Sequence, residues 1–388
     1  MNNGKYLFAQ VTSFLPANDF IKCVKKYDGN YKVQHFTCWH QLMCMLFGQL
    51  STRASLSDLV MCLTTQRDKW YHLGMGTGLS KSNLAYANEH RDWRIFADYA
   101  YILIAQARKI CTSSDEFDLK VDGNVYAVDS TTVDLCLSVF WWAKFRKNKA
   151  AVKIHTQFDV KTDIPSFIHI SDGSVHDVNF MDMIEYETGG YYVFDKGYID
   201  YDRLYLIHQS NAYFVSRFKE NGNYRRLYSA KVDKSTGVMC DQTIRLNNYY
   251  AAKDYPEKLR RIKYYDDLTC NTFEFATNNF QMTALDIAKL YKHRWSVELF
   301  FKWIKQHLRV KSFWGYSDNA VRIQIYTAII AYVTVAILKE KLKIKHTNYE
   351  ILQVLSITLL NKIQLEQLFQ ETYLQDFKEL NANQLILL

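Results

Sequence analysis

Two aspartates in this 388-residue chain each follow a short stretch of apolar, largely β-branched or aromatic residues. Asp129 comes after Val125–Val128, in AVDSTTVDL, and Asp195 comes after Tyr191–Phe194, in YYVFDKGY. An acid at the end of a strand lies at the edge of a sheet, where it can project into a cleft, and two such acids on adjacent strands could share a metal ion. An aspartate after a strand is more often a turn or helix-cap residue, so neither position is informative alone.

A third acid lies in a predicted helix beside several cations. In LYKHRWSVELFFKWIKQHLRV, an acid, its cations and a tyrosine share one helical face at ~100° per residue; they are Tyr291, Arg294, Glu298, Lys302 and Lys305. The acid of such a stripe can bind a metal ion, and its cations can hold phosphates. A solvated face with an i,i+4 pair between Arg294 and Glu298 explains the same spacing.

The combined pattern resembles a known family. The spacing Y-x2-R-x3-E-x6-K, met by Tyr291, Arg294, Glu298 and Lys305, is similar to the signature of the bacterial DDE transposases named after insertion sequence four. The stretches that begin at Asp129 (DST) and Asp195 (DKGY) resemble the family's two aspartate motifs, in the right order. The resemblance extends over about 120 to 315.

The resemblance implies an α/β fold with a ribonuclease-H-like mixed sheet at its core and helical regions at both ends. The chain would then divide into a helical DNA-binding region (1–118), a catalytic core in two pieces (119–217 and 281–318), a β-rich insertion (218–280) and a C-terminal helical region (319–388). The strand-like stretches Ile262–Tyr265 and Thr272–Ala276 suit the insertion.

The same resemblance implies a DNA transposase that cleaves insertion-sequence ends and joins them to target DNA. Its catalytic residues would be Asp129, Asp195 and Glu298, which would hold two Mg²⁺ ions, with Mn²⁺ as a substitute. The side chains of the helical stripe would hold DNA phosphates; they are Tyr291, Arg294, Lys302 and Lys305. The expected partner is double-stranded DNA (terminal repeats and target), bound by a homodimer.

The sequence departs from the family in one respect. Some members hold a flipped base with a tryptophan of the insertion, but residues 196–290 contain no Trp. Tyrosines that could stack on a base instead are Tyr249, Tyr250, Tyr264 and Tyr265. Two other functions stay open: a related nuclease without strand transfer, and a non-catalytic DNA-binding protein derived from a transposase. A two-carboxylate glycosidase leaves the cations around Glu298 unexplained.

The rest of the chain must position these residues. Its length predicts two or three domains, and its net charge of +8 is a weak bias toward anionic partners. Its eight cysteines include no C-x-x-C pair, which argues against a zinc site and a disulfide scaffold. No signal peptide is apparent, and the apolar run Ile325–Leu338 is shorter than a membrane span, so we expect a buried helix in a bacterial cytoplasmic protein that is nucleoid-associated when bound to DNA.

Helical patterns dominate the first 118 residues. Ser55–Leu63, the glycine-rich turn Gly74–Gly78 and Ser80–Tyr86 are compatible with a helix-turn-helix DNA reader followed by Arg91 and Arg94, and equally with an ordinary helical hairpin. From Thr283 onward a long helical pattern, which carries the polar stripe, is predicted to run to about Lys311.

Overall fold

The computed structural model describes the chain except for residues 1–3, 112–116, 147–148, 219–221, 308–312 and 370–388. It divides into two compact units. The first combines Met1–Cys111 with Lys302–Leu388, and the second is Thr112–Phe301.

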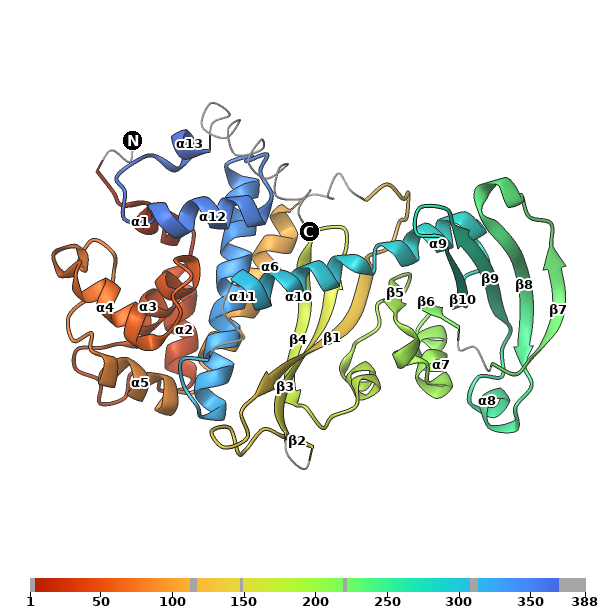
Figure 1. The fold of residues 1–388 in the computed structure, drawn as a ribbon, viewed down its shortest axis with the longest axis horizontal. Helices are drawn as coiled ribbons and strands as arrows, with labels where there is room; N and C mark the ends of the chain where they lie inside the picture. The colour runs from red at the N-terminus through yellow and green to blue at the C-terminus, as the bar shows by residue number, and fades with distance from the viewer. Residues whose placement is uncertain (1–3, 112–116, 147–148, 219–221, 308–312, 370–388) are drawn as a thin grey trace. The chain divides into compact units, whose positions relative to one another are not determined.

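The first unit is helical (Figure 1). Its described helices are α1 (Leu7–Thr12), α2 (Ala17–Lys26), α3 (Cys38–Leu50), α4 (Leu56–Thr64), η1 (Arg67–Lys69), α5 (Lys81–His90), α6 (Arg94–Ile110), α11 (Asp318–Lys341), α12 (Asn348–Thr358) and α13 (Leu365–Leu368). Thr37 caps α3, because its hydroxyl accepts a hydrogen bond from the His40 backbone N–H.

Helix α11 contains the apolar run noted in the sequence. By length and composition it could cross a membrane, but 94% of its most apolar window is buried inside the protein. It packs against α3 and α6, and the expectation of a buried core helix is confirmed.

The predicted helix–turn–helix segment contains α4, η1 and α5. The two arginines beyond it are engaged within the unit: Arg91 donates to the side chain of Gln41 and to the backbone carbonyl of Phe36, and Arg94 pairs with Asp92. These contacts explain both arginines without DNA, so a DNA-reading role for this segment stays a prediction.

The second unit is built on one ten-stranded sheet with the order β2-β3-β1-β5-β6-β10-β9-β8-β7, in which β4 also pairs with β3 (Figure 1). The strands are β1 (Val125–Leu135), β2 (Lys144–Arg146), β3 (Lys149–Asp159), β4 (Ile164–Asp172), β5 (Tyr191–Phe194), β6 (Tyr213–Arg217), β7 (Tyr224–Ala230), β8 (Val238–Leu246), β9 (Leu259–Asp266) and β10 (Asn271–Thr277). Described helices of this unit are η2 (Asp177–Met183), η3 (Lys196–Tyr198), α7 (Tyr201–Gln209), η4 (Lys234–Thr236), α8 (Tyr249–Asp254) and α9 (Ala284–Lys292).

The central strands have the ribonuclease-H-like arrangement. β4, β3 and β1 are antiparallel neighbours, while β5 and β6 run parallel to β1 on its other side. Strands β7–β10 follow as an antiparallel extension of the same sheet, joined through the pairing of β10 with β6. The predicted mixed α/β fold class is confirmed, and so are the strands expected in 218–280.

Two elements differ from the prediction. The strand predicted at Val125–Val128 does not end before Asp129 but continues to Leu135 as β1, because the residues from Asp129 onward also pair with β3. The long helix after Thr283 is divided into α9 and α10 (Trp295–His307). At the division the backbone hydrogen bonds span three residues instead of four, as between the Arg294 N–H and the Tyr291 carbonyl.

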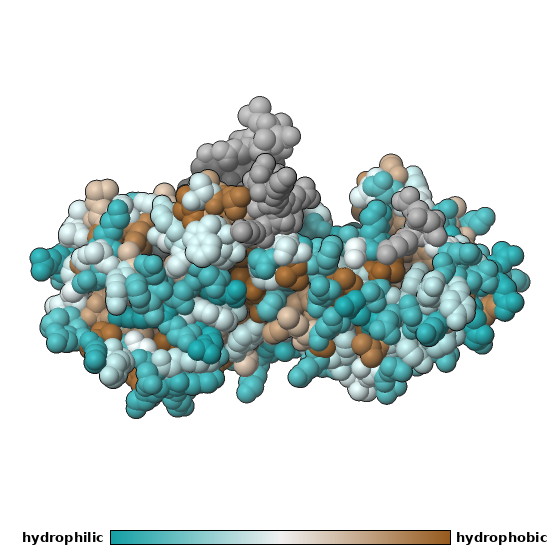
Figure 2. All heavy atoms as spheres, turned by 90° about the horizontal axis from the view of Figure 1, so that it is seen from below, coloured by the Kyte–Doolittle hydropathy of each residue, from teal (hydrophilic) through white to brown (hydrophobic). Residues whose placement is uncertain are grey.

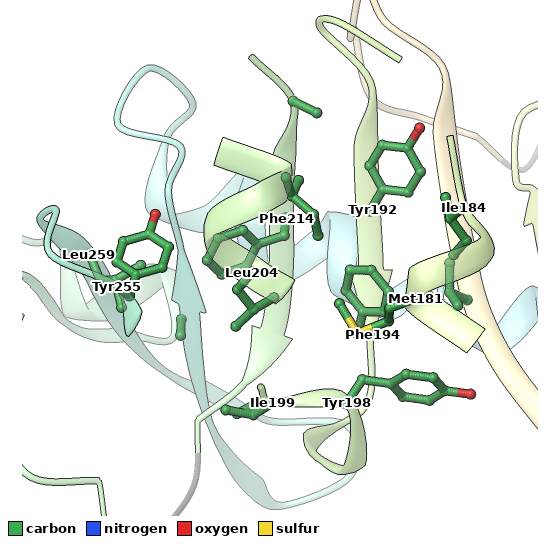
Figure 3. Packing of buried hydrophobic residues seen from close by; sticks show 14 of the residues in the cluster. Met181, Ile184, Tyr192, Phe194, Tyr198, Ile199, Leu204, Phe214, Tyr255 and Leu259 are labelled. Carbon is green, nitrogen blue, oxygen red and sulfur yellow. The ribbon is translucent and has the colours of Figure 1, made fainter. Parts of the chain in front are cut away.

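A buried apolar cluster covers one face of β5 and β6 (Figure 3). Phe194, Leu204 and Phe214, from β5, α7 and β6, are almost fully buried there. Burial of such a side chain contributes roughly 1.5–3 kcal/mol, so the cluster fixes this face of the sheet firmly. Because side chains alternate along a strand, the residues next to the cluster members in sequence project from the opposite face.

Candidate active site

The first two acids lie side by side in the sheet. Val128 of β1 pairs with Phe194 of β5 at the end of their parallel register, and Asp129 and Asp195 are the next residue of each chain segment. Val128 and Phe194 belong to the buried cluster. The alternation of strand side chains therefore directs both aspartates to the opposite face of the sheet.

The start of α10 packs on that opposite face. The ring of Phe300 lies 5.2 Å from the ring of Phe158, which pairs with Ala127, two residues before Asp129. At the end of α9, the Tyr291 ring lies 4.8 Å from that of Phe275 on β10. These two contacts anchor the segment that carries Arg294 and Glu298 over the two aspartates.

Arg294 connects two of the three acids. Its Nη1 donates to Asp129 Oδ2 at 3.2 Å and its Nη2 donates to Glu298 Oε1 at 2.5 Å. Because the two nitrogens belong to one guanidinium fork, the two carboxylate oxygens lie within about 8 Å of each other. The hydroxyl of Tyr291 donates to Asp195 Oδ1 at 3.4 Å. The structure thus brings together five predicted site residues from positions far apart in the sequence.

The acids also interact through their charges. Burial raises the pKa of Asp129 to about 6, opposed by the Ser130 backbone N–H and by Arg294, while the charges of Glu298 and Asp195 raise it further. Burial raises the pKa of Tyr291 to about 12, so its hydroxyl keeps its proton at neutral pH and can donate it to an anion.

The donor set suits a hard cation in its chemistry. The three acids offer only carboxylate oxygens, which Mg²⁺ prefers. Among the residues that the structure describes, no three His, Cys, Asp or Glu side chains are grouped closely enough to form a preassembled metal cluster. The guanidinium of Arg294 lies between Asp129 and Glu298 instead, and supplies the positive charge that two facing carboxylates require.

Lys302 and Lys305 lie on α10, four and seven residues after Glu298. The second unit ends at Phe301, so both lysines belong to the first unit. Their proposed contact with DNA phosphates stays a prediction. Among the tyrosines considered for base stacking, Tyr249 and Tyr250 are 77% and 73% exposed on α8, whereas Tyr264 and Tyr265 are half-buried.

A polar group behind Asp129 was not predicted as part of the site. The Ser130 hydroxyl donates to Asp177 Oδ1 at 2.6 Å, and Lys153 Nζ donates to the same oxygen at 3.0 Å. Burial acts to raise the pKa of Asp177, but the hydrogen bonds from Ser130 and Lys153 outweigh it and the pKa is lowered. An ionised Asp177 thus fixes the strand next to Asp129. Its signal in the sequence is only an acid without a recognisable motif.

Comparison with known proteins agrees with this geometry. Residues 121–334 match a family model described as a transposase DDE domain, and residues 3–76 match one described only as a domain of unknown function. The first of these spans every residue of the candidate site.

Three curated proteins are similar to the chain. It is 35% identical to "Putative transposase y4zB" of Sinorhizobium fredii, over 66% of this chain and 70% of that protein. It is 29% identical to "Probable transposase for insertion sequence element IS5377" of Geobacillus stearothermophilus, over 63% of this chain and 64% of that protein. It is 27% identical to "Putative transposase for insertion sequence element IS4SA" of Synechocystis, over 71% and 77%.

A solved structure of the piggyBac transposase synaptic complex with hairpin DNA matches at a TM-score of 0.47 and 10% identity, over 98% of this chain and 86% of that chain. The family model covers more than half of the chain, and the first curated relative is 35% identical over most of its own length. This chain therefore belongs to the DDE transposases, which are enzymes that act on DNA.

Proposed function

We propose that this transposase cleaves the ends of its own insertion sequence in a metal-dependent reaction and transfers the cut strands to target DNA. The observation that carries the proposal is the contact of one guanidinium with two acids. Arg294 donates hydrogen bonds to Asp129 and Glu298, which are 169 residues apart in sequence. Asp195 follows β5, the strand that pairs with β1 just before Asp129. A cluster of carboxylates with a cation and a tyrosine suits phosphodiester chemistry.

In this proposal Asp129, Asp195 and Glu298 hold two Mg²⁺ ions, for which Mn²⁺ can substitute. When bound, Mg²⁺ supplies activation of the attacking water or 3′-hydroxyl and neutralises charge on the leaving oxygen. Asp129 must be ionised to act as a ligand, and because its pKa is about 6, it is mostly ionised above neutral pH.

The remaining side chains of the site act on the DNA backbone. Arg294, released from the carboxylates as they bind metal, can form a bidentate contact with a phosphate. Tyr291 donates its retained proton to a phosphate oxygen, and Lys302 and Lys305 extend the cationic stripe along α10. The partner is double-stranded DNA of the terminal repeats and of the target, bound by a homodimer in the cytoplasm, with the first 118 residues as a further DNA-binding region.

The test incubates the full chain with a labelled duplex of its element's terminal repeat and a supercoiled target plasmid, with Mg²⁺ or with EDTA. Cleavage at the repeat boundary and its covalent joining to the plasmid are expected with Mg²⁺ only. Cleavage without joining would replace the transposase by a nuclease, and no cleavage under any metal condition would identify a non-catalytic DNA-binding protein. Cleavage in EDTA would reject the role given to metal.

A further inference from the structure

Among the residues that the structure describes, an arginine pair toward the far edge of the sheet has no acidic partner. Arg225 of β7 and Arg245 of β8 pair directly in the antiparallel register, so their side chains project from the same face. Both are exposed, and neither forms an ion pair within the described part of the chain. Like charges placed directly opposite each other are destabilising. The fold therefore keeps a repulsive pair where it gains nothing for its own stability.

The face that carries this pair is the face of the candidate active site. Asp241 lies on it too, four residues before Arg245, and binds the guanidinium of Arg260 at 2.7 Å. Arg260 in turn donates to the backbone carbonyls of Asn279 and Met282, directly before α9. Helix α9 ends at the turn that holds Arg294, so the pair and the site look out from the same side of the sheet.

On the opposite face of the neighbouring strands, cations are paired with an acid. There Arg261 and Lys263 share the carboxylate of Glu274, at 2.6 and 3.7 Å. Closer to the site, Arg217 of β6 lies on the active-site face, since it pairs with Phe275, and its guanidinium stacks over the ring of Phe273 at 5.2 Å. Arg217 has no ion pair among the described residues either.

The register gives the distance between the pair and the site. Phe275, which contacts Tyr291, pairs with Ile262, and Ile262 pairs with Asp241. Phe275 also pairs with Arg217 of β6, which is level with Asp195 at the end of β5. Arg245 is therefore four strands across and four residues along from Asp195, or roughly 20–25 Å at the usual strand spacing and rise. DNA rises ~3.4 Å per base pair, so this span corresponds to about seven base pairs.

We infer that Arg225 and Arg245, with Arg217 between them and the site, contact the phosphate backbone of the element end about seven base pairs from the cleaved bond. Both arginines are exposed, and no described acid neutralises them; on the face seen in Figure 2, the end that carries β7 and β8 is largely hydrophilic. Arginine suits this role because its guanidinium matches phosphate geometry. Exposed Tyr228 pairs with Thr243 and so lies on the same face, as an aromatic neighbour of the pair.

This inference rests on the proposed function, and its test is a binding measurement without metal. The full chain is titrated with a labelled terminal-repeat duplex in EDTA over a salt series. Log affinity falls with log salt concentration, and each lost phosphate contact makes this negative slope shallower by ~0.9. R225A/R245A is expected to make the slope shallower by about 2, and R225Q/R245Q by the same amount.

Arg226→Ala is the matched control. Arg226 is an exposed neighbour on the same strand, but it pairs with Ile244 and so projects from the opposite face. Its slope should equal that of the parent. An equal loss in R226A and the double variants, or no loss in the double variants, overturns the inference. Both double variants should melt no lower than the parent, because they remove a repulsion; a lower melting temperature would also count against the pair as described.

Methylphosphonate substitution locates the contact. Neutralising the phosphates about seven base pairs from the cleaved bond should weaken binding of the parent and of R226A, but should not weaken R225A/R245A further. Additive losses would show that the pair contacts other phosphates or none. If the salt slopes of the parent and the double variants differ as expected but the parent never cleaves with Mg²⁺, the proposed function is refuted and the backbone contact stands.

Discussion

Asp129→Asn should make the metal-free protein more stable while it abolishes cleavage. The Asp129 side chain is only 20% exposed, and its pKa is raised from 3.8 to about 6. One pKa unit corresponds to ~1.36 kcal/mol, so the ionised carboxylate costs the folded state about 3 kcal/mol above pH 7. Asn has nearly the same shape and keeps an oxygen that can accept from Arg294.

The raised pKa of Asp129 determines how the stability of the folded protein changes with pH. The folded state binds the Asp129 proton more tightly than the unfolded state, so stability is lost as pH rises from about 4 through about 6. Below that window both proteins are neutral at this position and should be equally stable. Above it, for a unit of this size, the variant should melt about 6–12 °C higher in EDTA, at ~2–4 °C per kcal/mol.

The measurement is thermal unfolding of the parent and Asp129→Asn at pH 4, 6 and 8, in EDTA and in Mg²⁺. Mg²⁺ should raise the melting temperature of the parent at pH 8, because it binds the ionised acids of the folded state only. It should leave the variant nearly unchanged. A variant that melts below the parent at pH 8 in EDTA, or a difference that does not vary with pH, would refute the assignment of Asp129 as a destabilised carboxylate.

Three further outcomes are expected. Glu298→Gln should lose at least ~10–100-fold in strand cleavage, since even outer-sphere changes at metal sites cost that much, while its affinity for the end duplex stays near that of the parent; full cleavage by this variant would exclude Glu298 as a ligand. Lys305→Ala should reduce the magnitude of the salt slope of end binding by about 1 without a change in the circular dichroism spectrum, and an unchanged slope would exclude Lys305 as a phosphate contact. Ca²⁺, as a non-catalytic ion, should increase the affinity for the end duplex. Arg294→Ala should reduce this increase, because the variant lacks the guanidinium that is proposed to leave the carboxylates for a phosphate. An equal increase in the parent and the variant would contradict this exchange.

The strands before the two aspartates were predictable because their signals are local, although β1 continues past Asp129 to Leu135. Apolar β-branched and aromatic runs before Asp129 and Asp195 indicated two strands, and the register places the two residues before the acids opposite each other. Periodicity also indicated the helical segment around Glu298. What local patterns could not supply was the pairing order. That the strands of 218–280 extend the core sheet through β10 and β6 depends on contacts between residues about 60 positions apart, such as Thr277 with Val215.

Residues without a motif escaped prediction for a related reason. Asp177 was one of several acids of equal standing in the sequence, and only the fold brings it within 2.6 Å of the Ser130 hydroxyl. Arg225 and Arg245 are 20 positions apart and ordinary in their local sequence. Their significance comes from a cross-strand register and from the absence of a neighbouring acid among the described residues, neither of which can be read from spacing.

The contacts of Arg294 in the structure differ from those that its place in the sequence suggests. In the sequence it is one cation of a stripe suited to phosphates, and a continuous helix would direct it along that stripe. The turn between α9 and α10 instead lets its fork reach both Asp129 and Glu298, with only 15% of the side chain exposed. The two hydrogen bonds to the carboxylates occupy one N–H of each terminal nitrogen of the guanidinium, so a bidentate phosphate contact through both of those nitrogens competes with them. In the proposed function, metal ions that neutralise the carboxylates would free Arg294 for a DNA phosphate, and metal binding and phosphate binding would then favour each other through this one side chain.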